Sequence, residues 1–94
     1  MKILWTDEAL DDLAAIIAYY YAKVSPRTAE SVERRIVQQI EGLPPFPERI
    51  RNSARIPGAR ELVVNSLPYI VFVKLQPDAI IVLNIVHTAR KFPA

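Results

Sequence analysis

The sequence predicts an α+β domain in which a hairpin of two helices packs on one face of a mainly antiparallel sheet. The predicted order is strand, helix, helix, strand, strand, strand. Two apolar stripes with helical spacing occupy the first half of the chain, and three consecutive strand-like runs occupy the second. A length of 94 residues leaves room for a single domain, residues 1–94.

The first predicted elements are a short strand and a helix. The apolar run "KILW" favours a strand, and Thr6 follows it as the N-cap of a helix. Asp7 and Glu8 then occupy the first turn, where the helix dipole favours carboxylates. The apolar stripe of this helix recurs at intervals of three and four residues: Leu10, Leu13, Ile17, Tyr20 and Val24.

A second helix follows after a very short link. Ser25 is its predicted N-cap and Pro26 its first residue, a position that suits proline. Its apolar stripe consists of Ala29, Val32, Ile36, Ile40 and Leu43. The prolines of "PPFP" at residues 44–47 end this helix, so the two helices are predicted to form a hairpin.

The second half of the chain is predicted to form the sheet. Residues 48–58, "ERIRNSARIPG", form a basic loop, and strand-like runs follow at residues 60–64, 69–75 and 79–87. The connectors "NSLP" and "QPD" contain turn-forming residues and are short enough to join antiparallel neighbours.

The last run, residues 79–87, is apolar on both faces. Alternation places Ile80, Val82 and Val86 on one face, and Ile81, Leu83 and Ile85 on the other. Because a half-solvated strand would alternate with polar residues, this run is predicted to be an interior strand. The hairpin can cover one face only, so the tail, another chain or both are expected to cover part of the other.

The composition excludes several kinds of site. The chain has no cysteine and one histidine, which excludes disulfides, a cysteine nucleophile and the usual zinc sites, so no metal is expected. Its two glycines lie far apart, which excludes a phosphate-cradling loop, and no cofactor is expected. The absence of cysteine fits a reducing cytosol, and no signal peptide or membrane span is recognised. A cytoplasmic protein without a membrane partner is therefore expected.

The charges are distributed unevenly along the chain. Residues 1–48 have five Lys/Arg and eight Asp/Glu, a net charge of −3, whereas residues 49–94 have seven and two, a net charge of +5. The second half is therefore a candidate surface for a polyanion or an acidic protein, and the alternative is an ordinary solvated basic face.

One candidate catalytic group closes the last predicted strand. The imidazole of His87 is the side chain best suited to general acid–base work near neutral pH. Arg60 opens another strand, and Arg90 and Lys91 follow the last one. If these strand ends meet, they form a cationic pocket that would suit cleavage of a phosphodiester. The alternative is that His87 is an ordinary strand-terminal residue.

A candidate binding surface lies on the first helix. Tyr19 points roughly opposite the core stripe, near Ile16 and Lys23. An exposed tyrosine beside an isoleucine can anchor a partner protein, because tyrosine is enriched in interface hot spots. The alternative is an isolated surface aromatic.

Several stretches together resemble the ParE/RelE superfamily of bacterial toxins, which are the toxin halves of toxin–antitoxin modules. They are the loop ending "RIPGARELVV", the strand "PYIVFV" and the terminus "VHTARKFP", in the element order given above. The resemblance covers nearly the whole chain and implies a RelE/ParE-like fold and a cognate antitoxin as partner. It also implies contact with operator DNA only through that antitoxin.

The superfamily has two main branches, and the departures from its pattern help to choose between them. RelE-like members cut messenger RNA on the ribosome, whereas ParE-like members poison DNA gyrase. Many members have Pro-Tyr-Arg in the third strand, but here Ile70 replaces the arginine, and Phe92 stands nearest to the missing C-terminal tyrosine. His87 and Arg90 match the His-x-x-Arg ending that is common in ParE-like chains.

The resemblance therefore favours a ParE-like gyrase inhibitor with no catalytic residues. Under this interpretation the target-binding residues are Arg60, His87, Arg90, Lys91 and Phe92, and the antitoxin-binding residues are Ile16, Tyr19 and Lys23. The first alternative is a ribosome-dependent messenger RNA endonuclease that uses His87, Arg60 and Arg90. The second is a non-toxic binding module that acts only with its antitoxin in operon regulation.

Overall fold

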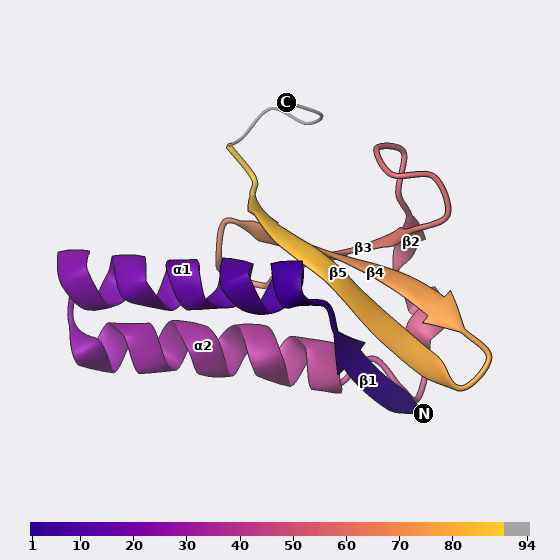
Figure 1. Cartoon of the computed structure of the whole chain (residues 1–94), viewed down its shortest axis with the longest axis horizontal. Helices are drawn as coiled ribbons and strands as arrows, with labels where there is room; N and C mark the ends of the chain where they lie inside the picture. The colour runs from indigo at the N-terminus through magenta and orange to yellow at the C-terminus, as the bar shows by residue number, and fades with distance from the viewer. Residues whose placement is uncertain (90–94) are drawn as a thin grey trace.

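The computed structural model describes residues 1–89 and consists of two helices on one five-stranded sheet (Figure 1). The strands lie in the order β1-β5-β4-β3-β2. The elements, in chain order, are β1 (Lys2–Trp5), α1 (Asp7–Lys23), α2 (Pro26–Glu41), η1 (Pro47–Arg49), β2 (Arg51–Asn52), β3 (Arg60–Val63), β4 (Tyr69–Gln76) and β5 (Ala79–His87). The predicted α+β class and helical hairpin are confirmed, and β2 is an addition to the predicted order.

Both predicted helix caps are present. The hydroxyl of Thr6 accepts the backbone N–H of Ala9 at 3.0 Å, and the hydroxyl of Ser25 accepts that of Thr28 at 3.0 Å. These bonds satisfy backbone donors that a helix start would otherwise leave without a partner. The helices therefore begin at Asp7 and Pro26, as the sequence predicts.

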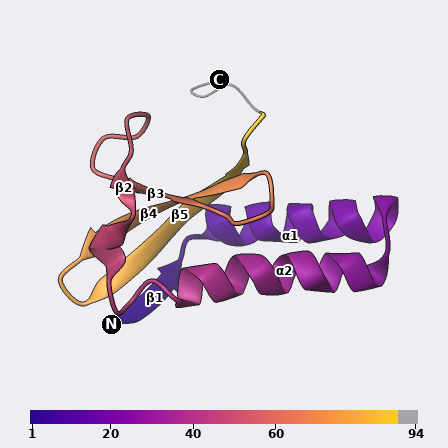
Figure 2. The ribbon, with the colours of Figure 1, turned by 180° about the vertical axis from the view of Figure 1, so that it is seen from behind.

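The predicted apolar stripe of α1 is wrong at its two ends. Leu10 and Val24 are about half exposed, at 49% and 58%, whereas Ala9 is fully buried. Figures 1 and 2 show the reason for Val24: the hairpin extends well beyond the sheet, so its distal end has no sheet beside it. The side of α1 that packs on the core runs through Ala9, Leu13, Ile16, Ile17 and Tyr20.

The predicted interior position of the last strand is confirmed. β5 lies between β1 and β4, with Leu4 opposite Ile81 in a parallel pair and Ile81 opposite Lys74 in an antiparallel pair. The β1–β5 pair makes the sheet mixed, whereas β2, β3, β4 and β5 are antiparallel neighbours.

A β-bulge in β5 changes the predicted faces of this strand. Val82 lies opposite Val73 and Asn84 opposite Phe72, so Leu83 is the extra residue. Beyond the bulge the alternation is reversed: Ile85 packs in the core beneath the helices, and Val86 packs on the opposite face. The prediction that Val86 shares a face with Ile80 and Val82 is therefore wrong.

The first helix compensates for the backbone groups that the bulge frees. The hydroxyl of Thr6 donates to the carbonyl of Leu83 at 2.7 Å, and its backbone N–H donates to the carbonyl of Val82 at 3.1 Å. Six residues further on, the carboxylate of Asp12 accepts the backbone N–H of Ile85 at 2.9 Å. Asp12 thus joins α1 to β5.

Arginines hold the long connection between α2 and β3. Arg49 donates to the carbonyl of Gly42 at 3.2 Å, and Arg60 donates to the carbonyls of Glu48 and Ile50 at 3.3 and 2.7 Å. The predicted basic loop therefore contains ordered structure, η1 and β2, and part of its positive charge has structural partners.

Apolar side chains are buried on both sides of the sheet. The larger core lies between the sheet and the helices, and a smaller one on the opposite side contains Ile70, Phe72 and Val86 with Ile56 and Leu83 packed against them. We call the side away from the helices the open face. Within residues 1–89, no helix is long and apolar enough to cross a membrane.

Candidate functional site

A cavity lies between α1 and the end of β5. We call it the tyrosine groove; it has a volume of about 420 Å³ and is lined by Asp12, Ala15, Ile16, Tyr19, Tyr20, Tyr69, Ile85 and His87. Its size falls in the range of sites that take a small ligand or a few side chains of a partner. The bulge in β5 helps to build it, because the reversed alternation turns Ile85 and His87 toward the helix.

Aromatic rings form much of the groove wall. Tyr69 and His87 face each other across β4 and β5 in an edge-to-face pair with ring centroids 5.4 Å apart, and Tyr19 and Tyr20 form a similar pair at 5.4 Å. Burial, together with a hydrogen bond and charge interactions with Tyr20, raises the pKa of the Tyr69 hydroxyl. The hydroxyl of Tyr69 is therefore harder to ionise than that of an ordinary tyrosine.

A hydrogen bond to the Nδ1 atom holds the imidazole of His87 in place. Its Nδ1 accepts the backbone N–H of Ala89 at 3.0 Å, so a neutral ring carries its proton on Nε2. The ring can then donate to an acceptor that enters the groove. His87 is exposed overall, and its contact with Tyr69 puts it beside the groove rather than isolated at a strand end.

The structure does not bring Arg60 to His87. Arg60 lies opposite Val73, and Val73 lies opposite Val82, which precedes His87 by five residues. At about 3.3 Å per residue this separates the two positions by roughly 16 Å along the sheet. Arg60 and His87 therefore do not form the cationic pocket that was expected if the strand ends met. None of the described residues that line the groove is Lys or Arg. Arg90, Lys91 and Phe92 lie outside the described residues.

The structure places two of the three expected antitoxin-binding residues in one groove. Ile16 and Tyr19 line it, and Tyr19 is 58% exposed. Lys23 is exposed in the last turn of α1, outside the groove lining. Between Asp12 and Lys23 the helix has no charged residue, although Ala14, Ala15, Ala18 and Ala22 are exposed. An uncharged exposed helix face is typical of a surface that binds another protein.

Sequence reasoning missed five groove residues: Asp12, Ala15, Tyr20, Tyr69 and Ile85. Asp12 could have been found from its spacing, since Asp12, Ile16 and Tyr19 follow one another at intervals of four and three on one helix face. Ile85 could not, because its face depends on the bulge.

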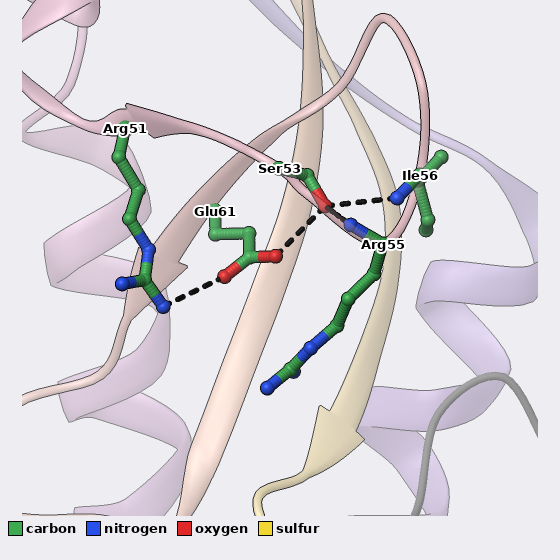
Figure 3. A network of polar contacts seen from close by, with 5 residues as sticks. All are labelled: Arg51, Ser53, Arg55, Ile56 and Glu61. Atoms are coloured by element: carbon green, nitrogen blue, oxygen red, sulfur yellow. Dashed lines mark hydrogen bonds and ion pairs between the residues drawn. The ribbon is translucent and has the colours of Figure 1, made fainter.

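A second polar site lies on the open face, where β3 meets the loop that follows β2 (Figure 3). We call it the Glu61 network. The buried carboxylate of Glu61 accepts Arg51 at 3.0 Å and the hydroxyl of Ser53 at 2.7 Å. The same hydroxyl accepts the backbone N–H groups of Arg55 and Ile56 at 3.0 and 2.9 Å. Glu61 thus fixes the turn that places Ile56 over the smaller core.

The network keeps Glu61 ionised. Burial on its own would raise the pKa of Glu61, but the hydrogen bonds from Ser53 and Arg51 and the charges of Arg51 and Arg55 outweigh it. The pKa is therefore lowered from its ordinary value of 4.5. A carboxyl group with a lowered pKa contributes stability that is present above the ordinary value and is lost as the pH falls through the folded-state value.

We expect Glu61→Gln to lower the free energy of unfolding by about 1–3 kcal/mol at neutral pH, the range for a hydrogen bond to a charged group. The difference from the parent chain should shrink as the pH falls from 4.5 through the lowered pKa of folded Glu61, because Glu61 then also becomes uncharged. Urea unfolding at neutral pH and at about pH 3 measures this. Glu48→Gln, at an exposed position, is the control, and an equal loss in both variants would contradict the role of Glu61.

Two helices on a five-stranded mixed sheet form a fold that also occurs in solved structures of small toxins. The isolated RelE toxin of E. coli has this fold, with a TM-score of 0.56 and 14% identity over 97% of this chain and 87% of that chain. The intact E. coli RelBE toxin–antitoxin complex matches with a TM-score of 0.54 and 14% identity, over 96% and 98% of the two chains. At this identity the likeness concerns the fold alone.

Three further findings concern the ParE branch. A structure of the chromosomal ParDE toxin–antitoxin system from P. aeruginosa matches with a TM-score of 0.84 and 26% identity, over 93% of this chain and 95% of that chain. Y4kP of Sinorhizobium fredii (strain NBRC 101917 / NGR234), whose name describes a presumed toxin, is 34% identical over 98% of this chain and 93% of its own length. The family described as "ParE toxin of type II toxin-antitoxin system, parDE" matches residues 3–92, so the chain belongs to the ParE toxin family. The sequence-based assignment to the ParE-like branch is confirmed.

Proposed function

We propose that this ParE-family toxin inhibits DNA gyrase by binding to it and is neutralised by an antitoxin that binds in the tyrosine groove. The observation that carries the antitoxin part is the groove itself, with Ile16 and Tyr19 beside an uncharged helix face. Burial of this apolar surface supplies most of the affinity, and charge attraction to an acidic antitoxin mainly raises the association rate.

The groove also suits neutralisation because of its place in the fold. His87 is a groove residue, and the chain leaves β5 there on its way to residues 90–94. A partner seated in the groove therefore lies beside His87, one of the expected target-binding residues. Contact with operator DNA is made only by the antitoxin in this proposal, and the complex acts in the cytoplasm.

Inhibition without chemistry is supported by the arrangement of the described polar groups. Cleavage of RNA needs positioned groups that stabilise developing charge, and loss of one such group lowers the rate by about 10²–10³. Arg60 is bonded to backbone carbonyls far from His87, so these two do not form one site. The toxin–target interaction is therefore proposed to be stoichiometric binding.

The alternative activity is ribosome-dependent cleavage of messenger RNA. One observation favours it, which is the pairing of His87 with Tyr69 in the groove. Two assays on the purified chain separate the proposals: DNA supercoiling by gyrase, and cleavage of messenger RNA on programmed ribosomes. We expect loss of supercoiling without RNA cleavage. Ribosome-dependent cuts that disappear in His87→Ala, with supercoiling unaffected, would overturn the gyrase proposal. Growth that continues when the chain is expressed without antitoxin would instead identify a non-toxic binding module.

A further inference from the structure

The open face of the sheet has an apolar strip that the rest of the described chain leaves uncovered. Leu4 is 49% exposed beside the half-buried Ile81, and Leu83 follows at the bulge. Ile3 and Trp5 point to the helix side, so Leu4 points to the open side. Val63, opposite Ile70, adds a second apolar group that is 55% exposed. Ile56 covers only the central part of this face.

Cations surround this apolar strip. Lys74 lies opposite Ile81, and Lys2 precedes Leu4 by two residues on the same side of β1; both lysines are exposed. At the other end of the face, Arg51 has a side chain that is 68% exposed, and Arg55 extends beside Glu61 (Figure 3). The single carboxylate that the strands place on this face is Glu61, which is buried and bonded to Arg51 and Ser53. The exposed charge that the strands place on this face is thus positive. One exposed carboxylate, Asp78, lies beside Lys2 in the turn between β4 and β5, where its carbonyl accepts the backbone N–H of Lys2 at 3.1 Å.

The face also contains an unused acceptor. The side-chain oxygen of Asn84 is buried and has no hydrogen-bond partner among the described residues. Asn84 lies opposite Phe72, whose side chain is in the smaller core, so the amide belongs to the open face. Burying such an oxygen without a donor is unfavourable.

We propose that the open face binds the toxin's protein target through an acidic segment with apolar side chains. The apolar side chains cover the strip from Leu4 to Leu83, and the carboxylates face Lys2, Lys74 and Arg51. This inference rests on the proposed toxin function and locates a target surface on the side of the sheet opposite the tyrosine groove. The uncovered leucines favour a protein over nucleic acid, because phosphate contacts need cations and make no use of exposed aliphatic side chains.

Charge reversal on this face tests the proposal. Lys74→Glu should raise the toxin concentration needed for half inhibition of gyrase supercoiling by about tenfold or more, because like charges then face each other across the interface. Leu4→Ser should weaken inhibition in the same direction. Arg35→Glu makes the same charge change on an exposed position of α2, and we expect it to inhibit like the parent chain. Thermal unfolding of each variant checks that the fold is intact.

Growth arrest on expression without antitoxin gives a readout that does not depend on gyrase. If the parent chain arrests growth but does not inhibit gyrase, the gyrase proposal fails, and relief of arrest by Lys74→Glu but not by Arg35→Glu still supports the open face. Folded Lys74→Glu and Leu4→Ser chains that arrest growth as the parent does would overturn the inference. Three other results would also overturn it. A Lys74→Glu chain that stays toxic but is no longer neutralised would show that the antitoxin binds the open face, and binding of a short DNA duplex that Lys74→Glu abolishes would show that nucleic acid does. The third is a parent chain with no toxicity.

Discussion

Tyr19→Ala is expected to weaken antitoxin binding by about 30-fold, which corresponds to about 2 kcal/mol, while the toxin stays folded and toxic. Tyr19 lines the tyrosine groove with its ring edge against Tyr20, and 58% of it is exposed in the free toxin. A partner that fills the groove would bury this ring completely. Because the ring is mostly exposed before binding, its removal should have little effect on the free energy of unfolding.

The adjacent residue supplies a matched control. Tyr21 is 62% exposed on the same helix but does not line the groove. Tyr21→Ala should therefore bind the antitoxin within about threefold of the parent chain, since most residues around a hot spot contribute little. Calorimetric titration with the antitoxin that rescues growth on co-expression measures both variants. Equal losses in the two would show that the groove is not the site, and a loss of toxicity in Tyr19→Ala would place this tyrosine on the target surface instead.

Lys23 allows the electrostatic contribution to antitoxin binding to be separated from the apolar one. It is exposed at the end of α1, outside the groove lining, so its charge acts at a distance. Its contribution should appear mainly in the association rate and disappear with added salt, whereas that of Tyr19 should persist.

The elements of this fold were predictable because each depends on local chemistry. Thr6 and Ser25 cap their helices, and the range 79–87 is bounded by turn residues, so the sequence alone predicts these limits correctly. The two-sided apolar pattern of residues 79–87 likewise predicts an interior strand, and β5 does lie between β1 and β4 with residues in the cores on both sides of the sheet.

The site was less predictable because it depends on contacts between distant segments. The bulge at Leu83 is stabilised by Thr6 and Asp12, which lie more than seventy residues earlier in the chain. Alternation alone therefore assigns Val86 to the wrong face. The role of Arg60 in target binding stays a prediction. What the sequence could not reveal is that its side chain donates to two carbonyls of the connection before β3.

The small core on the open face should contribute strongly to the stability of the domain. We expect Phe72→Ala to lower the free energy of unfolding by about 3–5 kcal/mol, a large share of the about 5–15 kcal/mol typical of a whole domain. Phe72 is fully buried although no helix covers its side of the sheet. Ile56 packs against its cluster, and the Glu61 network holds Ile56 in place. A solvated sheet face would predict a much smaller loss.

Phe46→Ala is the matched control for this prediction. Phe46 is 69% exposed in the connection after α2, so removing the same side chain there should change the free energy of unfolding by about 0.5 kcal/mol or less. Urea unfolding followed by circular dichroism measures both variants. If Phe72→Ala were as mild as Phe46→Ala, the loop around Ile56 would not seal the smaller core. The double variant Phe72→Ala/Glu61→Gln tests whether the two residues act together. Its loss of unfolding free energy should be smaller than the sum of the two single losses, because each change alone already loosens the contact of Ile56 with the sheet.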